Sequence, residues 1–346
     1  MVSGFRLRRR RGTGWGPGSL ILAALALAGC GRAEQFPQTV FDPAGPVARI
    51  QLDLLMRTLY LVIGIFILVA GVLLYVVFRY RERPGAGDPE QIHGNTQLEM
   101  AWTIAPIVAL AFIAVPTVRA NFAVAEPPPE SDPLVVRAVG HQWWFEFQYP
   151  DLGVITANEL HIPVGRPVKL LLDSEDVIHS FWVPRLAGKT DMIPGYQNTM
   201  WIQADEPGTY YGQCAELCGA SHAKMRFRVI AVSEEEFQAW VERMQTYTVD
   251  VSSSALAARG MELFREKGCF ACHAIAGTEF QNRVGPDLTG VGSRTTIAAG
   301  TLANTRENLS RWLADPPAIK PGSKMPNLGL KPDEIEALVE FLHSLK

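Results

Sequence analysis

Four residues with soft, metal-binding side chains lie within one short segment of the chain. Cys214 and Cys218 are four residues apart, His222 follows four residues later, and Met225 comes three residues after that. Thiolates, imidazole and thioether are ligands for copper, zinc or iron–sulfur centres rather than for magnesium or calcium. The two cysteines by themselves would also suit a disulfide, which oxidising compartments favour. The segment therefore predicts a soft-metal site or a disulfide, and the surrounding sequence has to decide between them.

A second cysteine pair lies nearer the C-terminus. Cys269 and Cys272 are separated by two residues, and His273 follows directly. This spacing is the attachment signature of a c-type haem, in which both cysteines form thioethers and the histidine binds the iron. A disulfide or a zinc site is the alternative. Met325 is the only methionine after the motif, and a Met/His ligand pair suits an electron-transfer haem.

Length, charge and cysteine usage limit the classes of protein to consider. The 346 residues allow two or three domains, and a net charge of −3 is too small to indicate a nucleic-acid partner. With Cys30, the five cysteines make one single residue and two close pairs. This pattern indicates three separate chemical roles rather than a disulfide scaffold.

The N-terminus has the pattern of a secretory signal. Residues 6–11 are strongly basic, and residues 20–28 form an apolar run that is too short to span a membrane as a stable helix. The run ends in Leu-Ala-Gly-Cys, which resembles a bacterial lipobox with Cys30 as the lipidated first residue of the mature chain. An ordinary signal peptide is the alternative. We therefore assign residues 1–29 to a signal peptide and residues 30–53 to the mature N-terminal segment.

Two apolar runs predict a transmembrane helix hairpin over residues 54–120. Residues 54–78 and 100–118 are each about as long as the ~20 residues that cross a bilayer. Arg79, Arg81 and Arg83 follow the first run, and positive charge marks the cytoplasmic side. The loop should therefore lie inside and both flanking segments outside, which is also what a lipidated N-terminus requires. Glu99, at the cytoplasmic start of the second run, is interpreted as a solvated helix-start carboxylate or as part of a proton path.

A strand-rich region follows the membrane segment. Residues 134–139, 143–149, 155–162 and 167–172 read as short strands, with Pro and Gly turn signals between them. This spacing predicts an antiparallel sandwich or barrel over residues 131–232. His179 lies within it, where a structural role is the ordinary interpretation. A sandwich also brings distant loops together, so His179 is a candidate partner of the soft-ligand segment.

The number of candidate ligands favours two metal ions over one. A mononuclear blue-copper site needs a single cysteine, and a structural zinc site has no role for Met225.

The C-terminal region reads as a separate helical domain over residues 255–346. A linker spans residues 233–254, in which residues 233–247 read as a charged helix and residues 248–254 as a short polar stretch. An amphipathic helix is expected over residues 255–267, just before the haem motif. A closing helix over residues 333–345 carries an apolar stripe, which should pack against the helix before the haem. The loop that begins at Gly285 is the expected neighbour of the proximal histidine.

Residues 98–230 resemble subunit II of the haem–copper cytochrome c oxidases. The likeness is carried by residues 140–144, which read Gly-His-Gln-Trp-Trp, and by residues 176–184, 188–195 and 210–225. Residues 255–346 resemble a small class I cytochrome c, so the whole chain is similar to subunit II of a caa-type oxidase. The resemblance implies a multidomain fold: a two-helix transmembrane hairpin, an all-β cupredoxin-like domain and an all-α class I cytochrome c domain.

The resemblance also implies roles for single residues. Cys214 and Cys218 would bridge the two ions of a copper A centre, and the Glu216 side chain would face a magnesium site shared with subunit I. Trp143 would be an exposed aromatic at which electrons enter, although a buried structural tryptophan is the alternative. Glu99 would lie at the mouth of a proton channel. The remaining implied copper ligands are His179, His222, Met225 and the backbone carbonyl of Glu216.

The implied function is electron entry into a proton-translocating cytochrome c oxidase of the bacterial cytoplasmic membrane, with the copper and haem domains on the periplasmic side. The donor would be a cytochrome c or an upstream quinol–cytochrome c reductase. The partners would be oxidase subunits I and III and membrane lipid, and subunit I would reduce oxygen. A nitric oxide reductase subunit and a copper-carrying lipoprotein are the alternatives. Nitrous oxide reductase and quinol oxidase subunits are disfavoured, because the first needs a histidine-rich copper cluster and the second lacks the copper ligands present here.

Overall fold

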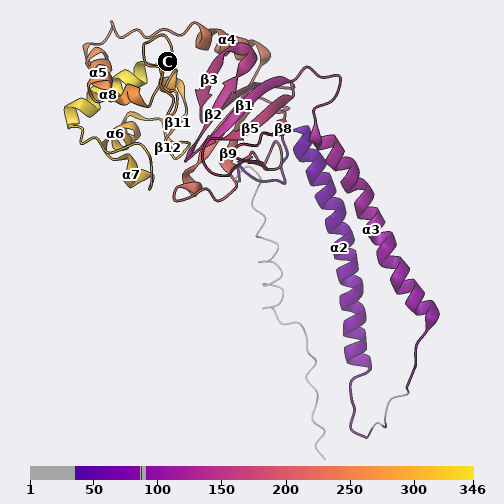
Figure 1. The fold of residues 1–346 in the computed structure, drawn as a ribbon. Coiled ribbons are helices and arrows are strands. Elements are labelled where there is room, and N and C mark those ends of the chain that lie inside the picture. The colour runs from indigo at the N-terminus through magenta and orange to yellow at the C-terminus, as the bar shows by residue number, and fades with distance from the viewer. Residues whose placement is uncertain (1–35, 86, 88–90) are drawn as a thin grey trace, which may run out of the picture. The chain divides into compact units, whose positions relative to one another are not determined.

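The computed structural model describes residues 36–85, 87 and 91–346 (Figure 1). The predicted signal peptide and Cys30 lie outside the described residues.

Two long apolar helices, α2 (Pro46–Arg79) and α3 (Thr96–Ala125), correspond to the predicted hairpin (Figure 1). Each is long and apolar enough to cross a membrane. Helix α2 begins eight residues before the apolar run predicted from residue 54, because Pro46 favours the first helical position and Val47 packs into the core of the β domain. The first turns of α2 therefore belong to the soluble domain.

The β domain consists of two five-stranded sheets that form a sandwich (Figure 1). The first sheet has the order β3 (Val154–Ala157), β2 (Trp144–Tyr149), β1 (Leu134–His141), β5 (Val168–Ser174) and β8 (Asn198–Ile202). The second has the order β4 (Glu159–Pro163), β10 (Arg226–Val232), β9 (Gly208–Cys214), β6 (His179–Trp182) and β7 (Thr190–Met192). Most neighbours are antiparallel, but β1 pairs with β5, and β4 with β10, in parallel. The predicted sandwich is confirmed.

The single strand predicted over residues 155–162 is wrong. The chain breaks at Asn158, which has a φ of 60°, so that β3 pairs with β2 in one sheet while β4 pairs with β10 in the other. The Asn158 side chain accepts a hydrogen bond from the Phe145 backbone at 3.0 Å. Asparagine tolerates the left-handed region better than other side chains, which lets the chain change sheets here.

Aromatic side chains fill the space between the sheets. Phe145, Phe147, Phe181 and Phe227 are all fully buried and in mutual contact. Gly212 lies so close to Phe227 that an added Cβ would come within 2.3 Å of the ring. The core therefore packs tightly against β9, the strand that ends at Cys214.

The C-terminal domain is helical, as predicted. Helix α4 (Glu234–Gln245), capped by Ser233, leads into it. Its elements are α5 (Ala255–Glu266), η4 (Cys269–Ala271), η5 (Val291–Ser293), β11 (Thr296–Ile297), β12 (Leu302–Ala303), α6 (Arg306–Ala314), α7 (Pro316–Ile319) and α8 (Pro332–Ser344). Helix α5 packs on α8 at Gly260, where an added Cβ would lie 2.1 Å from the Ala337 carbonyl oxygen. This packing confirms the apolar stripe predicted for the closing helix.

Candidate functional site

Strand pairing brings the distant histidine beside the cysteine segment. His179 is the first residue of β6 and Cys214 the last of β9, and these two strands pair with Phe181 opposite Cys214. Cys218 lies in the following loop, and His222 begins the short helix η3 (His222–Lys224). All four residues therefore meet at one end of the second sheet.

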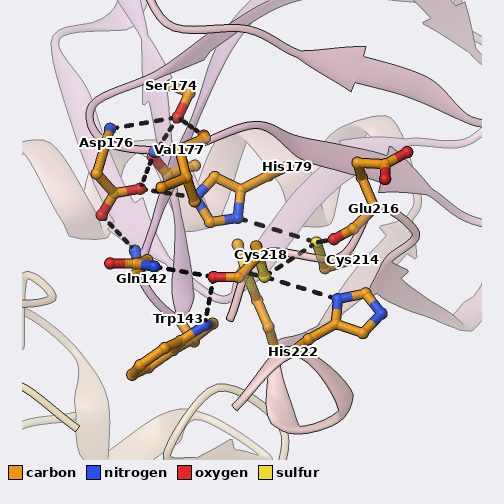
Figure 2. A network of polar contacts seen from close by, with 12 residues as sticks. Gln142, Trp143, Ser174, Asp176, Val177, His179, Cys214, Glu216, Cys218 and His222 are labelled. Carbon is orange, nitrogen blue, oxygen red and sulfur yellow. Dashed lines mark hydrogen bonds and ion pairs between the residues drawn. The ribbon is translucent and has the colours of Figure 1, made fainter. Parts of the chain in front are cut away.

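The two sulfurs lie at the centre of this group (Figure 2). The Sγ atoms of Cys214 and Cys218 are 3.7 Å apart. Nδ1 of His179 lies 3.9 Å from Sγ of Cys214, and Nδ1 of His222 lies 3.6 Å from Sγ of Cys218. Both imidazoles thus present the same ring nitrogen to the sulfur pair, one from each side.

Two further predicted ligands complete the group. The thioether sulfur of Met225 is 3.9 Å from Sγ of Cys218, and the backbone carbonyl oxygen of Glu216 is 3.3 Å from Sγ of Cys214. The Glu216 carboxylate instead points away from the sulfurs (Figure 2). It pairs with the Lys189 amine at 3.3 Å. The carbonyl and the side chain of Glu216 therefore face different surroundings, and the magnesium site expected at the side chain stays a prediction.

The site is dry and strongly polarised. Cys214, Cys218, His179 and Met225 are all buried. The pKa of Cys214 is lowered by its contacts with the Cys218 sulfur and with His179. The pKa of Cys218 is raised by the same neighbouring sulfur and by burial. The close approach of the two sulfurs thus shifts the pKa values of the two thiols in opposite directions.

Asp176 orients His179. Its Oδ1 atom lies 2.8 Å from Nε2 of His179, on the side of the ring away from the sulfurs. Burial by itself would lower the pKa of His179, but the contacts with Cys214 and Asp176 raise it. Burial would raise the pKa of Asp176, but hydrogen bonds from His179 and from backbone amides hold it at about 2. A carboxylate behind a histidine is the usual partner that fixes the ring of a metal ligand.

These donors fit a soft-metal centre better than the alternatives. Nδ1 of His179 and both sulfurs lie within 4.8 Å of one another, and all three residues are buried. A disulfide between the two cysteines would not explain why both imidazoles lie beside the sulfurs. A zinc site would not use the thioether of Met225, which lies beside Cys218.

Trp143 does not have the exposure that was expected of it. The side chain is 8 % exposed, and its indole Nε1 donates a hydrogen bond to the Cys218 carbonyl at 3.0 Å. The Gln142 side chain donates to the same oxygen at 2.8 Å. The tryptophan that was expected to be exposed is therefore buried and contacts the loop that carries Cys218, and its role in electron entry stays a prediction. Trp144 stacks on His141 and serves packing.

Glu99 lies in the first turn of α3 and is exposed. One of its carboxylate oxygens accepts the backbone N–H of Asn95 at 3.3 Å, while the Asn95 side chain caps the helix. This is the arrangement of a helix-start carboxylate, and the role in a proton path stays a prediction.

The haem motif is arranged around the histidine. Cys269 and Cys272 lie in and after η4, and His273 follows. Nδ1 of His273 lies 2.7 Å from the Pro286 carbonyl oxygen, which leaves Nε2 for an iron ligand. Gly285 lies against the ring, where an added Cβ would come within 2.8 Å of Cε1. The residues present therefore fit the proximal side of a c-type haem.

Met325 lies in the loop between α7 and α8. It is partly buried and packs against the same apolar cluster as Cys269 and Phe270. This placement is compatible with its predicted role as the second iron ligand.

Asp176 and Gln142 have roles that were not expected from the sequence, although both lie inside the motifs that carry the family resemblance. An aspartate three residues before a candidate histidine ligand is a usable signal for the first. Nothing in the sequence indicates that Gln142 reaches a carbonyl 76 positions away.

Comparison with known proteins agrees with this arrangement. Residues 33–120 match the cytochrome c oxidase subunit II transmembrane domain, residues 154–232 its periplasmic domain, and residues 257–346 the cytochrome c family. The matched domains imply a copper A centre and a haem c.

Curated relatives match almost the whole chain. Cytochrome c oxidase subunit 2 of Alkalihalophilus pseudofirmus is 40 % identical over 94 % of this chain and 96 % of its own length. The protein of the same name from Bacillus subtilis is 38 % identical over 94 % and 96 %. Among solved structures, the periplasmic domain of subunit II from Bradyrhizobium japonicum is 34 % identical, covers 34 % of this chain and 96 % of that chain, and has a TM-score of 0.33. The chain therefore belongs to the cytochrome c oxidase subunit 2 family and carries a cytochrome c domain after the copper domain.

Proposed function

We propose that this chain is the electron-entry subunit of its oxidase. A donor, either a cytochrome c or an upstream quinol–cytochrome c reductase, delivers electrons to haem c. They continue to a dinuclear copper A centre and then to subunit I, which reduces oxygen and pumps protons. The observation that carries the proposal is the convergence of two imidazoles and a thioether on the sulfur pair of Cys214 and Cys218.

The ligand roles follow from these contacts. Cys214 and Cys218 would supply the thiolate ligands shared by the copper centre, Nδ1 of His179 and of His222 would supply its imidazole ligands, and Met225 and the Glu216 carbonyl would be weaker ligands. When bound, such a centre supplies a one-electron carrier whose charge is shared by two metals. The protein buries both sulfurs, which excludes water, and holds His179 in place through Asp176. Because the ligands are held rigidly, little reorganisation accompanies a change of charge, which favours fast transfer.

In the haem domain, Cys269 and Cys272 would hold a haem through thioethers, Nε2 of His273 would bind its iron, and Met325 would be the second iron ligand. The contact from His273 to the Pro286 carbonyl orients the ring. A Met/His pair raises the reduction potential of the haem.

The remaining predictions concern the membrane side. Cys30 is the lipid anchor, the arginine cluster after α2 lies in the cytoplasm, and both soluble domains lie outside it. Glu99 lies at the mouth of a proton channel, and the Glu216 carboxylate faces a magnesium ion at the subunit I interface. Subunit III completes the complex.

The test is made on the oxidase purified with all its subunits. We expect two copper ions and one haem c for each copy of this chain, a near-infrared band of mixed-valence copper, and reduction of haem before copper after rapid mixing with reduced cytochrome c. The chain freed from subunit I should keep both cofactors but consume no oxygen. Zinc at the cysteine site, or a Cys214–Cys218 disulfide in the active complex, would overturn the proposal.

A further inference from the structure

Trp143 is covered by a loop of the haem domain. Gly322, in the segment between α7 and Met325, lies against the indole, so that an added Cβ would come 2.7 Å from Cη2 and 3.1 Å from Cζ3 of Trp143. The φ of Gly322 is +78°, a conformation that also favours glycine. Backbone of the haem domain therefore lies directly on the ring that contacts the copper-site loop.

Lys320 fastens this loop to the copper domain. Its side chain is buried, with 5 % of the residue exposed, and the amine donates to the Trp143 carbonyl at 2.5 Å and to the Ala298 carbonyl at 3.3 Å. Burial lowers the pKa of Lys320 to about 7. A buried amine is costly unless its hydrogen bonds are made, so separation of the two domains would cost these bonds.

Further contacts surround Lys320. The hydroxyl of Ser221 donates to the Pro321 carbonyl at 2.6 Å, and the amine of Lys224 donates to the Ile319 carbonyl. Lys324 forms an ion pair with Asp176 at 3.1 Å. Residues 319–324, which we call the docking loop, are thus held on the side of the copper domain where the cysteine loop lies.

A second patch fixes the haem domain at another point. Glu159 on β4 is buried and accepts hydrogen bonds from the backbone N–H and the hydroxyl of Thr295, at 2.8 and 2.5 Å, and from the Thr296 N–H at 3.3 Å. The backbone N–H of Arg226 donates to the Ala299 carbonyl at 3.0 Å. Two separated patches determine the orientation of one domain on the other, which a single contact would not.

We propose that the docking loop seats the haem domain on Trp143 and closes this tryptophan to outside donors, so that it takes electrons only from the chain's own haem. Lys320 and Gly322 are the positioning residues. In this step one electron leaves the haem iron and one electron is gained at the copper site, with no proton moved and no bond broken. The inference rests on the proposed function, because it assigns the route within it.

Two glycines allow a matched test of the docking. Gly322 and Gly329 both have positive φ, +78° and +61°, but an added Cβ at Gly329 meets nothing within 4 Å. Gly322→Ala and Gly329→Ala therefore bear a similar backbone strain, and only the first pushes against Trp143. Both variants are made in the full chain, within the purified complex.

The first measurement is hydrogen exchange at the amides of Thr295, Thr296 and Arg226, which bond across the interface. Overpacking at Gly322 should speed their exchange by on the order of tenfold, while Gly329→Ala leaves it unchanged. Unchanged exchange in Gly322→Ala, with haem and copper loaded, would contradict the role of the docking loop.

The second measurement is rapid mixing with reduced soluble cytochrome c. In the unmodified complex, copper should never be reduced ahead of haem c. In Gly322→Ala, part of the copper should be reduced without prior reduction of haem c. Copper reduced first in the unmodified complex would overturn the closure of Trp143. Failure of the proposed function would give a different result. The interface amides would stay protected from exchange, but reduced haem c would not transfer an electron to copper.

Should Gly322→Ala fail to load its cofactors, Lys320→Met replaces it, with the exposed Lys331→Met as control. Loss of the buried amine should speed the same amide exchange by about tenfold. No change relative to Lys331→Met would reject Lys320 as a positioning residue.

Discussion

The indole Nε1 of Trp143 donates a hydrogen bond to the backbone carbonyl of Cys218 at 3.0 Å. This bond joins the turn between β1 and β2 to the loop that follows Cys214 and carries Cys218. On its other side the same ring lies against Gly322 of the haem domain. One side chain therefore contacts both the cysteine loop and the cytochrome c domain.

Replacement of Trp143 by Phe should slow haem-to-copper transfer while copper stays bound. The Cys218 carbonyl keeps its bond from Gln142, so the lost hydrogen bond should lower stability by only about 1 kcal/mol. Flash-induced electron transfer in the complex measures the rate. Trp144→Phe, which alters a ring stacked on His141, is the control. Equal rates in the two variants would contradict a special role for Trp143.

Asp176→Asn should weaken copper binding by about 10- to 100-fold, as is usual when the partner of a ligating histidine is changed. The amide cannot hold Nε2 of His179 as the carboxylate does. Copper retained against a graded series of chelators measures the affinity. Asp173→Asn changes a carboxylate of the same domain that pairs with Arg137 instead. If both variants hold copper like the unmodified chain, Asp176 does not support the site.

Met325→Leu should leave haem covalently attached but lower its reduction potential, because the thioether ligand is lost. Methionine and leucine have similar volumes, so packing should change by less than about 1.5 kcal/mol. A redox titration of haem c measures the potential. Met261→Leu, at a partly buried position that packs on the same cluster, should leave the potential unchanged. An unaltered potential in Met325→Leu would require another axial ligand.

His161 should make the β domain less stable in acid. It stacks on Trp240, and burial lowers its pKa from 6.5 to about 4. Between pH 4 and 6.5 the unfolded chain binds more protons than the folded chain, so the free energy of unfolding rises with pH over this range. Acidification through the same range should therefore lower the free energy of unfolding by at most about 3 kcal/mol.

The melting temperature of the complex, followed across this pH range, tests the effect. His161→Phe should flatten the pH dependence even if it shifts the absolute value. His93→Phe, at an exposed position in the loop before α3, should leave the slope as it is. A slope that persists in His161→Phe would assign the acid sensitivity to other groups.

Much of this protein can be predicted from local sequence, because the relevant physics acts over short distances. The span of apolar residues defines the membrane helices, and Cys269, Cys272 and His273 lie close enough along the chain to serve one haem. The cysteine loop with His222 and Met225 is equally local. Helices α5 and α8 follow from amphipathic periodicity, which needs no knowledge of their partner.

Only the tertiary structure decided the features that depend on long-range packing. The break at Asn158 sends one predicted strand into two sheets, and β6 pairing with β9 brings His179 to Cys214. Trp143 is covered in part by Gly322, which is distant in the sequence and lies against the indole ring because the two domains pack together. Local sequence patterns indicate which residues prefer an apolar or metal-binding environment. They do not record which surface of the same molecule will cover a given side chain, because that follows from the packing of all the elements together.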